Sequence, residues 1–192
     1  MLNRHIDSVI DRHYATTNKA LLLSGARQVG KTYAIRRYVQ KAGLDLVEMN
    51  FLLQPETKRI PEGAANVQEL LLRISAYANR PLEPGKTLIF FDEVEEYADI
   101  LTWVKALVDE GRFKYALSGS LLGLELKNVR SEPVGYMSEF QMFPLDFEEF
   151  IRNVGVTDEV INSVRGAWEQ HKPVDAYIHE KLIHLFNLFL IV

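Results

Sequence analysis

The chain has 192 residues, of which 47% are hydrophobic and 25% are charged, a composition typical of a globular protein with one sizeable core. It contains no cysteine, which excludes disulfide bonds and thiolate metal sites. Its net charge of −4 disfavours a general nucleic-acid-coating role, and no apolar run is long enough to span a membrane.

The first half of the chain alternates between predicted helices and strands. Apolar residues at helical spacing indicate the helices, and short apolar or alternating runs indicate the strands. We expect a helix over residues 2–14, a strand over 19–24, a helix from residue 31 to near Gly43, a strand over 44–51 and a helix over 66–79.

The second half continues the alternation and then becomes helical. We expect strands over 87–91, 113–117 and 139–143, a helix over 98–110 after the first of them, and three helices over 146–154, 157–170 and 174–191. Strands that alternate with helices predict an α/β fold with a parallel sheet and right-handed crossovers. Ligands of such sheets bind at the carboxyl ends of the strands.

A phosphate-binding loop pattern, G-x-x-x-x-G-K-[ST], follows the first predicted strand and precedes a helix. The glycines allow a tight turn whose N–H groups point at phosphate oxygens, and the helix N-terminus favours the same anion. Lys31 can reach the β- and γ-phosphates, and the Thr32 hydroxyl can ligate Mg²⁺. We assign nucleotide binding to Gly25, Ala26, Arg27, Gln28, Val29, Gly30, Lys31, Thr32 and Tyr33.

Two acidic residues follow the apolar strand over 87–91. Asp92 can hold Mg²⁺ beside the phosphates, and Glu93 can orient or deprotonate the attacking water. We therefore predict Thr32 and Asp92 as metal ligands and Glu93, Lys31 and Ser118 as catalytic. Ser118 ends a further strand, where its hydroxyl could sense the γ-phosphate or position water, or could simply bond within a turn.

Five blocks of sequence resemble a family of AAA+ ATPases of bacteria and archaea, whose phosphate loop reads G-A-R-Q-V-G-K-T. The matching blocks are Gly25–Thr32, Leu88–Val94, Ser118–Gly123, Pro133–Tyr136 and Phe143–Phe150. The resemblance implies a P-loop NTPase fold of about five parallel strands in the order 5-1-4-3-2, flanked by helices. It also implies ATP and Mg²⁺ as ligands and a sensor role for Ser118.

The chain departs from that family at three positions. Glu95 stands where members often have Gln, and Ser118 stands where many have Thr. Val134 and Gly135 replace a Gly-Arg pair, so an arginine finger is not expected there. Arg130 is either a substitute for that arginine or an exposed loop residue.

The resemblance also divides the chain into two parts. We expect an ATP-binding domain of AAA+ type over residues 1–150 and a helical extension over 151–192, the truncated start of a further region. The end of the last helix is apolar nearly all round, so it either packs on its own domain or provides an interface for a homo-oligomer or a protein partner. The first 20 residues are too polar for a signal peptide, and we expect a cytoplasmic location.

The sequence favours Mg²⁺-dependent ATP hydrolysis of AAA+ type. Glu93 directly follows the metal acid and suits water activation, which disfavours a small-molecule kinase. Two alternatives stay open: a nucleotide-gated interaction module with little turnover, and a truncated fragment with no activity of its own.

Overall fold

The computed structural model describes residues 3–120 and 135–191. The chain divides into two units, which we call the sheet unit (Ile6–Phe143) and the helical unit (Met1–His5 with Pro144–Val192). Arg130, Val134 and half of each of the two matching blocks around them, Ser118–Gly123 and Pro133–Tyr136, lie outside the described residues.

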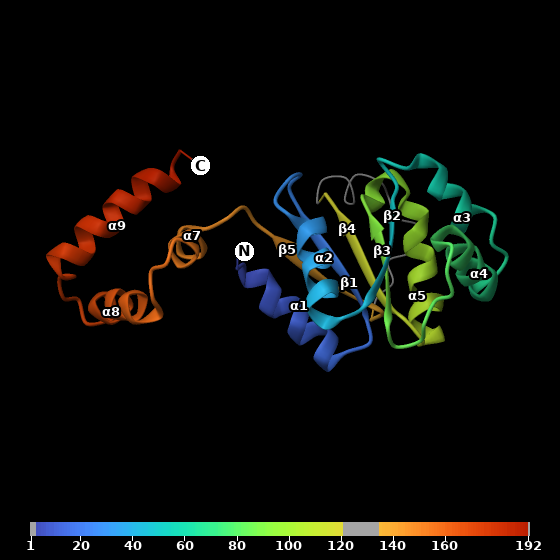
Figure 1. The fold of residues 1–192 in the computed structure, drawn as a ribbon, viewed down its shortest axis with the longest axis horizontal. Coiled ribbons are helices and arrows are strands. Elements are labelled where there is room, and N and C mark those ends of the chain that lie inside the picture. The colour runs from blue at the N-terminus through green and yellow to red at the C-terminus, as the bar shows by residue number, and fades with distance from the viewer. Residues whose placement is uncertain (1–2, 121–134, 192) are drawn as a thin grey trace. The chain divides into compact units, whose positions relative to one another are not determined.

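The sheet unit is built on a five-stranded parallel sheet with the order β2-β3-β4-β1-β5 (Figure 1). This is the predicted order, 5-1-4-3-2, read from the other edge, so the predicted fold class is confirmed. The strands are β1 (Ala20–Gly25), β2 (Asp45–Asn50), β3 (Thr87–Asp92), β4 (Lys114–Gly119) and β5 (Met137–Met142).

Helices cover both faces of the sheet. The side chains of α1 (His5–Thr16) and α2 (Lys31–Ala42) pack with Leu21, Leu23 and Phe90 on one face. Those of α4 (Val67–Ala78) and α5 (Leu101–Glu110) pack on the other. Because both faces are buried, β1 and β3 are unbroken buried strands, whereas an exposed face would require alternating polar residues.

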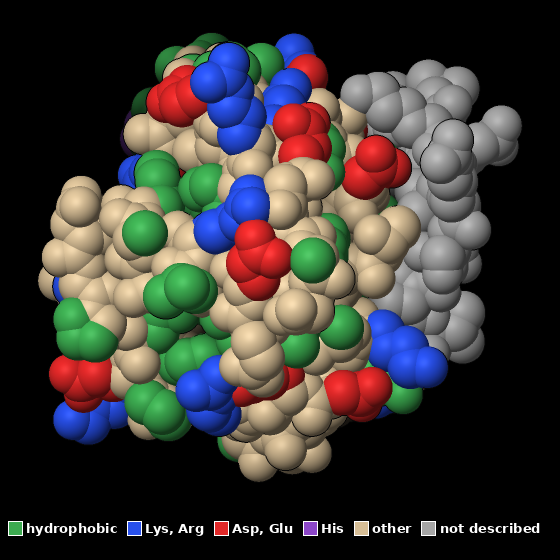
Figure 2. Space-filling view, turned by 90° about the vertical axis from the view of Figure 1, so that its right-hand side faces the viewer, with side chains coloured by type: hydrophobic (Ala, Val, Ile, Leu, Met, Phe, Trp, Pro, Cys, Tyr) green, Lys and Arg blue, Asp and Glu red, His purple; other side chains and the backbone are tan. Residues whose placement is uncertain are grey.

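Short elements complete the sheet unit at the connections. They are η1 (Pro55–Lys58), α3 (Arg59–Glu62), η2 (Val94–Glu96) and η3 (Ala98–Ile100), which the sequence patterns did not predict, apart from the start of the helix at 98. Figure 2 shows the side of the molecule at the right of Figure 1, where apolar side chains are interspersed with charged ones.

The helical unit contains α7 (Phe147–Asn153), α8 (Asp158–Glu169) and α9 (Ala176–Phe189), as predicted to within two residues at each end. Its small core consists of Ile151, Val156 and Ile161, against which partly buried residues of α7 and α9 pack. None of the described helices is long and apolar enough to cross a membrane.

Candidate nucleotide-binding site

The loop between β1 and α2 has the backbone conformation of an anion-binding turn. Gln28 has φ 65° and Gly30 has φ 99°, both in the left-handed region. Gly30 is also the N-cap of α2, and it provides no side chain to bond the first N–H groups of that helix. The free N–H groups at such a helix start favour an anion, and the left-handed residues turn neighbouring N–H groups toward it.

Lys31 lies beneath this loop with only 4% of its surface exposed. Its Nζ donates to the carbonyl oxygens of Gly25 (3.1 Å) and Ala26 (2.8 Å). An ammonium group has three N–H bonds, so one remains to reach a phosphate oxygen. The two carbonyls therefore fix the position of the cation at the base of the loop.

Asp92, at the end of β3, is the centre of a polar cluster. It is 1% exposed and accepts hydrogen bonds from Thr32 Oγ1 (3.0 Å to Oδ2) and from Ser118 Oγ. Three residues that the sequence singled out on separate elements thus meet at the carboxyl edge of the sheet. The hydroxyl and the carboxylate are hard oxygen donors of the kind that Mg²⁺ prefers.

Asn50 is a fourth member of this cluster, and the sequence analysis missed it. Its Nδ2 donates to Asp92 Oδ2 over 2.8 Å, while its Oδ1 accepts from the backbone N–H groups of Leu52 and Leu53. Asn50 lies directly opposite Asp92 in the β2–β3 pairing. Asn50 ends β2, the strand beside β3, and a polar residue at that position could have indicated a site residue.

Glu93 follows Asp92 and adopts a left-handed conformation with φ 57°. Burial raises the pKa of its carboxyl to about 7, with further contributions from a hydrogen bond and charge of Glu95 and from the charge of Asp92. Lys31 opposes this shift. The group therefore exchanges a proton near neutral pH, which is the range in which a general base is effective.

A pocket of about 280 Å³ lies beside the loop. It is lined by Gln28, Gly30, Lys31, Thr32, Tyr33, Arg36 and Glu93. The Arg36 guanidinium forms a two-pronged pair with Glu48, at 2.6 and 2.8 Å. Among the predicted binding residues, Arg27 lies 3.9 Å from Glu96, and Val29 packs against the core beneath α1 and α2.

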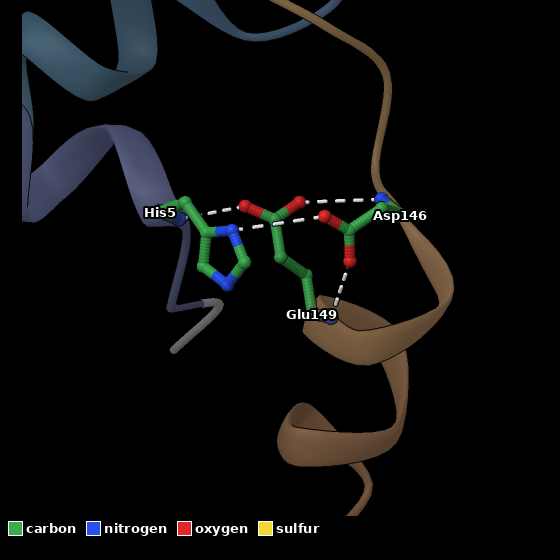
Figure 3. Close-up of side chains that lie close together, drawn as sticks. All are labelled: His5, Asp146 and Glu149. Atoms are coloured by element: carbon green, nitrogen blue, oxygen red, sulfur yellow. Dashed lines mark hydrogen bonds and ion pairs between the residues drawn. The ribbon is translucent and has the colours of Figure 1, made fainter. Parts of the chain in front are cut away.

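The helical unit has a second grouping of potential ligands, formed by His5, Asp146 and Glu149 (Figure 3). Asp146 and Glu149 form the capping box of α7, and Glu149 also accepts from the His5 backbone N–H (2.6 Å) and from Arg4 Nε (2.8 Å). Both oxygens of Glu149 are thus used by donors, one of them a guanidinium. This arrangement fits a helix cap that holds the N-terminal segment better than a cation site.

Comparisons with known proteins give a match to a family model and a distant match to a solved structure. Residues 17–151 match the model of a family described as an AAA domain. No curated protein matches the chain. The crystal structure of Cdc6p from Pyrobaculum aerophilum is similar, with 14% identity and a TM-score of 0.45 over 70% of this chain. That match covers 41% of the Cdc6p chain, and a similarity so distant says nothing of activity.

Proposed function

Because the chain belongs to the AAA domain family, we propose that it binds ATP together with Mg²⁺ and hydrolyses the bond between the β- and γ-phosphates. The family supports nucleotide binding by an AAA+ protein. Hydrolysis and the dependence on Mg²⁺ rest on the residues of the site.

The cluster around Asp92 is the observation that carries this proposal. A buried carboxylate bonded to Thr32 and Ser118 lies at the same sheet edge as the phosphate loop and its lysine. A buried acid is costly unless it is satisfied by donors or by a cation. Thr32 and Asp92 would hold Mg²⁺, which when bound would neutralise charge on the phosphate oxygens.

The remaining residues have separate proposed roles. The loop N–H groups and Lys31 bind and orient the phosphates, and Tyr33 contributes to the wall of the pocket. Glu93, which lines the same pocket, would accept a proton from the attacking water. Ser118 would report the state of the site to β4 through its bond to Asp92.

The burial of Glu93 motivates a second candidate function. Burial raises the pKa of its carboxyl to about 7, and the protonated form would bind ATP without activating water, so a chain in which that form prevailed would have little turnover. Such a protein would act as a nucleotide-gated interaction module, and a partner that deprotonates or repositions Glu93 would raise its rate.

One experiment separates these two functions. ATP binding is measured by calorimetry and phosphate release by a steady-state assay, each with Mg²⁺ and with excess EDTA. If the chain hydrolyses ATP, we expect both ATP binding and a Mg²⁺-dependent release of phosphate that is lost in Glu93→Gln. Binding without release supports the interaction module, and the absence of binding rejects both.

A further inference from the structure

The two edges of the sheet differ in what covers their backbone groups. The strand β2 forms one edge and β5 forms the other (Figure 1). In an edge strand, alternate residues direct their N–H and C=O groups away from the sheet, where these groups can pair with a further strand. An edge that is left uncovered therefore offers its backbone to another chain.

The outward carbonyl groups of β2 are all occupied. The carbonyl oxygen of Leu46 accepts from Arg80 Nη2 over 2.8 Å. That of Glu48 accepts from the Tyr77 hydroxyl over 3.1 Å. That of Asn50 accepts from the backbone N–H four residues later over 2.9 Å. Donors from the end of α4 and from the turn after β2 thus block this edge.

The outward residues of β5 have no such cover. The carbonyl oxygen of Tyr136 accepts from the N–H of Ala20 in β1 over 2.9 Å, so every second residue from Tyr136 onward faces β1. The residues between them direct their backbone groups away from the sheet; these are Met137, Glu139 and Gln141. Within the part of the chain that the structure describes, no residue pairs with their outward N–H or C=O groups.

We propose that the outward edge of β5 binds an extended segment of another protein, which adds a strand to the sheet. The N–H and C=O groups of Met137, Glu139 and Gln141 would pair with the backbone of that segment. In this mode of recognition, main-chain hydrogen bonds provide affinity and the neighbouring side chains provide specificity. The proposal is independent of nucleotide binding and of ATP hydrolysis.

The charge of β5 indicates which segment fits. Glu139 is the only charged residue of the strand, and it is exposed. Facing residues of opposite charge stabilise a strand pair, and like charges destabilise it. A segment with lysine or arginine opposite Glu139 therefore fits this edge. A second copy of the chain fits poorly, because the antiparallel pairing that uses all three outward residues of both copies places Glu139 opposite Glu139.

The test is hydrogen exchange of the backbone amides, measured by NMR on the full chain with and without a peptide. The probe is a blocked seven-residue peptide of alternating threonine and valine with lysine at its centre, a composition that favours an extended strand. In the protein alone, we expect the outward amides of Met137, Glu139 and Gln141 to exchange faster than those of Ser138 and Phe140, which face β1. The peptide, at about 1 mM, should slow exchange at the three outward amides by about 10-fold or more.

The blocked edge provides the internal control. The outward amides of Leu46 and Glu48 in β2 should exchange at the same rate with and without peptide. A fully N-methylated peptide has no N–H groups to donate, so it should change none of these rates, whereas a contact made by side chains alone would persist. Gln141→Ala alters a neutral side chain of the same edge and should bind the lysine peptide as wild type does.

Charge selection is tested with a second peptide that has glutamate at its centre. We expect wild type to bind it about fivefold more weakly than the lysine peptide, and we expect Glu139→Lys to reverse that order. Should Glu139→Lys not fold, Glu139→Gln should bind the two peptides equally.

Three results would overturn the proposal. Slow exchange of the three outward amides in the protein alone would show that this edge is already covered, by the chain itself or by a second copy. Unchanged exchange at these amides with the lysine peptide would show that the edge does not accept a strand. Equal binding of the two peptides by wild type would show that Glu139 does not select the partner.

Discussion

The carbonyl oxygen of Met142 occupies the space that a side chain at Gly25 would need. A Cβ placed on Gly25 would lie 2.2 Å from that oxygen, and Gly25 has φ 149°. The two residues are partners at the end of the β1–β5 pairing. The first glycine of the phosphate loop is therefore required by the sheet, independently of any phosphate.

Gly25→Ala should consequently lower the free energy of unfolding in the absence of nucleotide. The methyl group would push β1 away from β5, and we expect a loss of more than about 2 kcal/mol. Gly43→Ala is the control, because Gly43 has φ 63° and no atom would lie within 4 Å of its added methyl group, so it tests backbone strain alone. Urea unfolding followed by circular dichroism measures both. Equal losses would contradict the clash with Met142.

Lys31→Ala should abolish the binding of Mg-ATP. The ammonium is held by two loop carbonyls at a point where it can bond a phosphate, and charge-assisted bonds of this kind are among the strongest in proteins. We expect at least about a 100-fold loss of affinity in titrations with a fluorescent ATP analogue. Lys86→Ala, which removes an exposed lysine paired with Glu83, should bind as wild type does. Equal affinity in wild type and Lys31→Ala would reject the site.

The fold could be predicted closely from the sequence, for a physical reason. Buried parallel strands such as residues 87–91 are apolar without interruption, and a short run of this kind between two helices is characteristic of a central strand. The short elements at 55–62 were missed because η1 and α3 have four residues each, too few for apolar residues to show a helical period. Their position depends on how the chain leaves β2.

The site could be predicted only in part. Lys31 and Thr32 follow from a local pattern, and Asp92 and Ser118 follow from strand ends. Asn50 also ends a strand and could have been suggested on that ground, but the partners of Asn50 and Glu95, which are Asp92 and Ser120, could not be assigned because these contacts join residues far apart in the sequence. Such partnerships depend on strand order and register, which can be assigned only once the sheet is known.

Substitutions of Asp92 and Glu93 should have different effects, the first on ATP binding and the second on turnover. Asp92→Ala removes a proposed ground-state metal ligand, so we expect weaker ATP binding in Mg²⁺ and unchanged binding in EDTA. Glu93→Gln removes a group that acts in the transition state, so binding should persist while turnover falls by about 100-fold or more. Calorimetry and phosphate release measure the two effects. If Glu93→Gln hydrolyses ATP at the wild-type rate, Glu93 is not the catalytic base.

The raised pKa of Glu93 predicts that the free energy of unfolding depends on pH. The folded pKa of about 7 lies above the ordinary value of 4.5, so the folded protein favours the protonated carboxyl. The stability associated with that form is fully present below pH 4.5 and is lost as the pH rises through 7. Glu93→Gln cannot ionise. We therefore expect it to exceed wild type in free energy of unfolding at pH 8 and to lose that advantage toward pH 5.

Glu139→Gln is the control for that comparison, since Glu139 lies on the edge strand β5 and is exposed. It should have little effect at either pH. A pH-independent difference between wild type and Glu93→Gln would mean that the buried charge is not the cause.

Some apolar residues of α9 pack within the helical unit, among them Leu182 and Leu185, whereas others in and just after the helix are exposed. Phe186 and Phe189 contact Phe147, with ring centroids 5.3 and 5.7 Å apart. Ile183, Leu190 and Ile191 are exposed, the last by 80%. Deleting residues 186–192 would therefore remove packing and exposed surface together, and it could not separate a core role from an interface role.

Point substitutions separate the two roles of this helix. Ile183→Ser, Leu190→Ser and Ile191→Ser, combined in one chain, should reduce self-association in sedimentation experiments and leave the melting temperature unchanged, because exposed apolar surface promotes association. Phe147→Ala should instead destabilise the helical unit by about 2 kcal/mol through lost aromatic packing. If the triple variant unfolds at a lower temperature and associates as wild type does, those three side chains serve the fold, and the interface hypothesis is wrong.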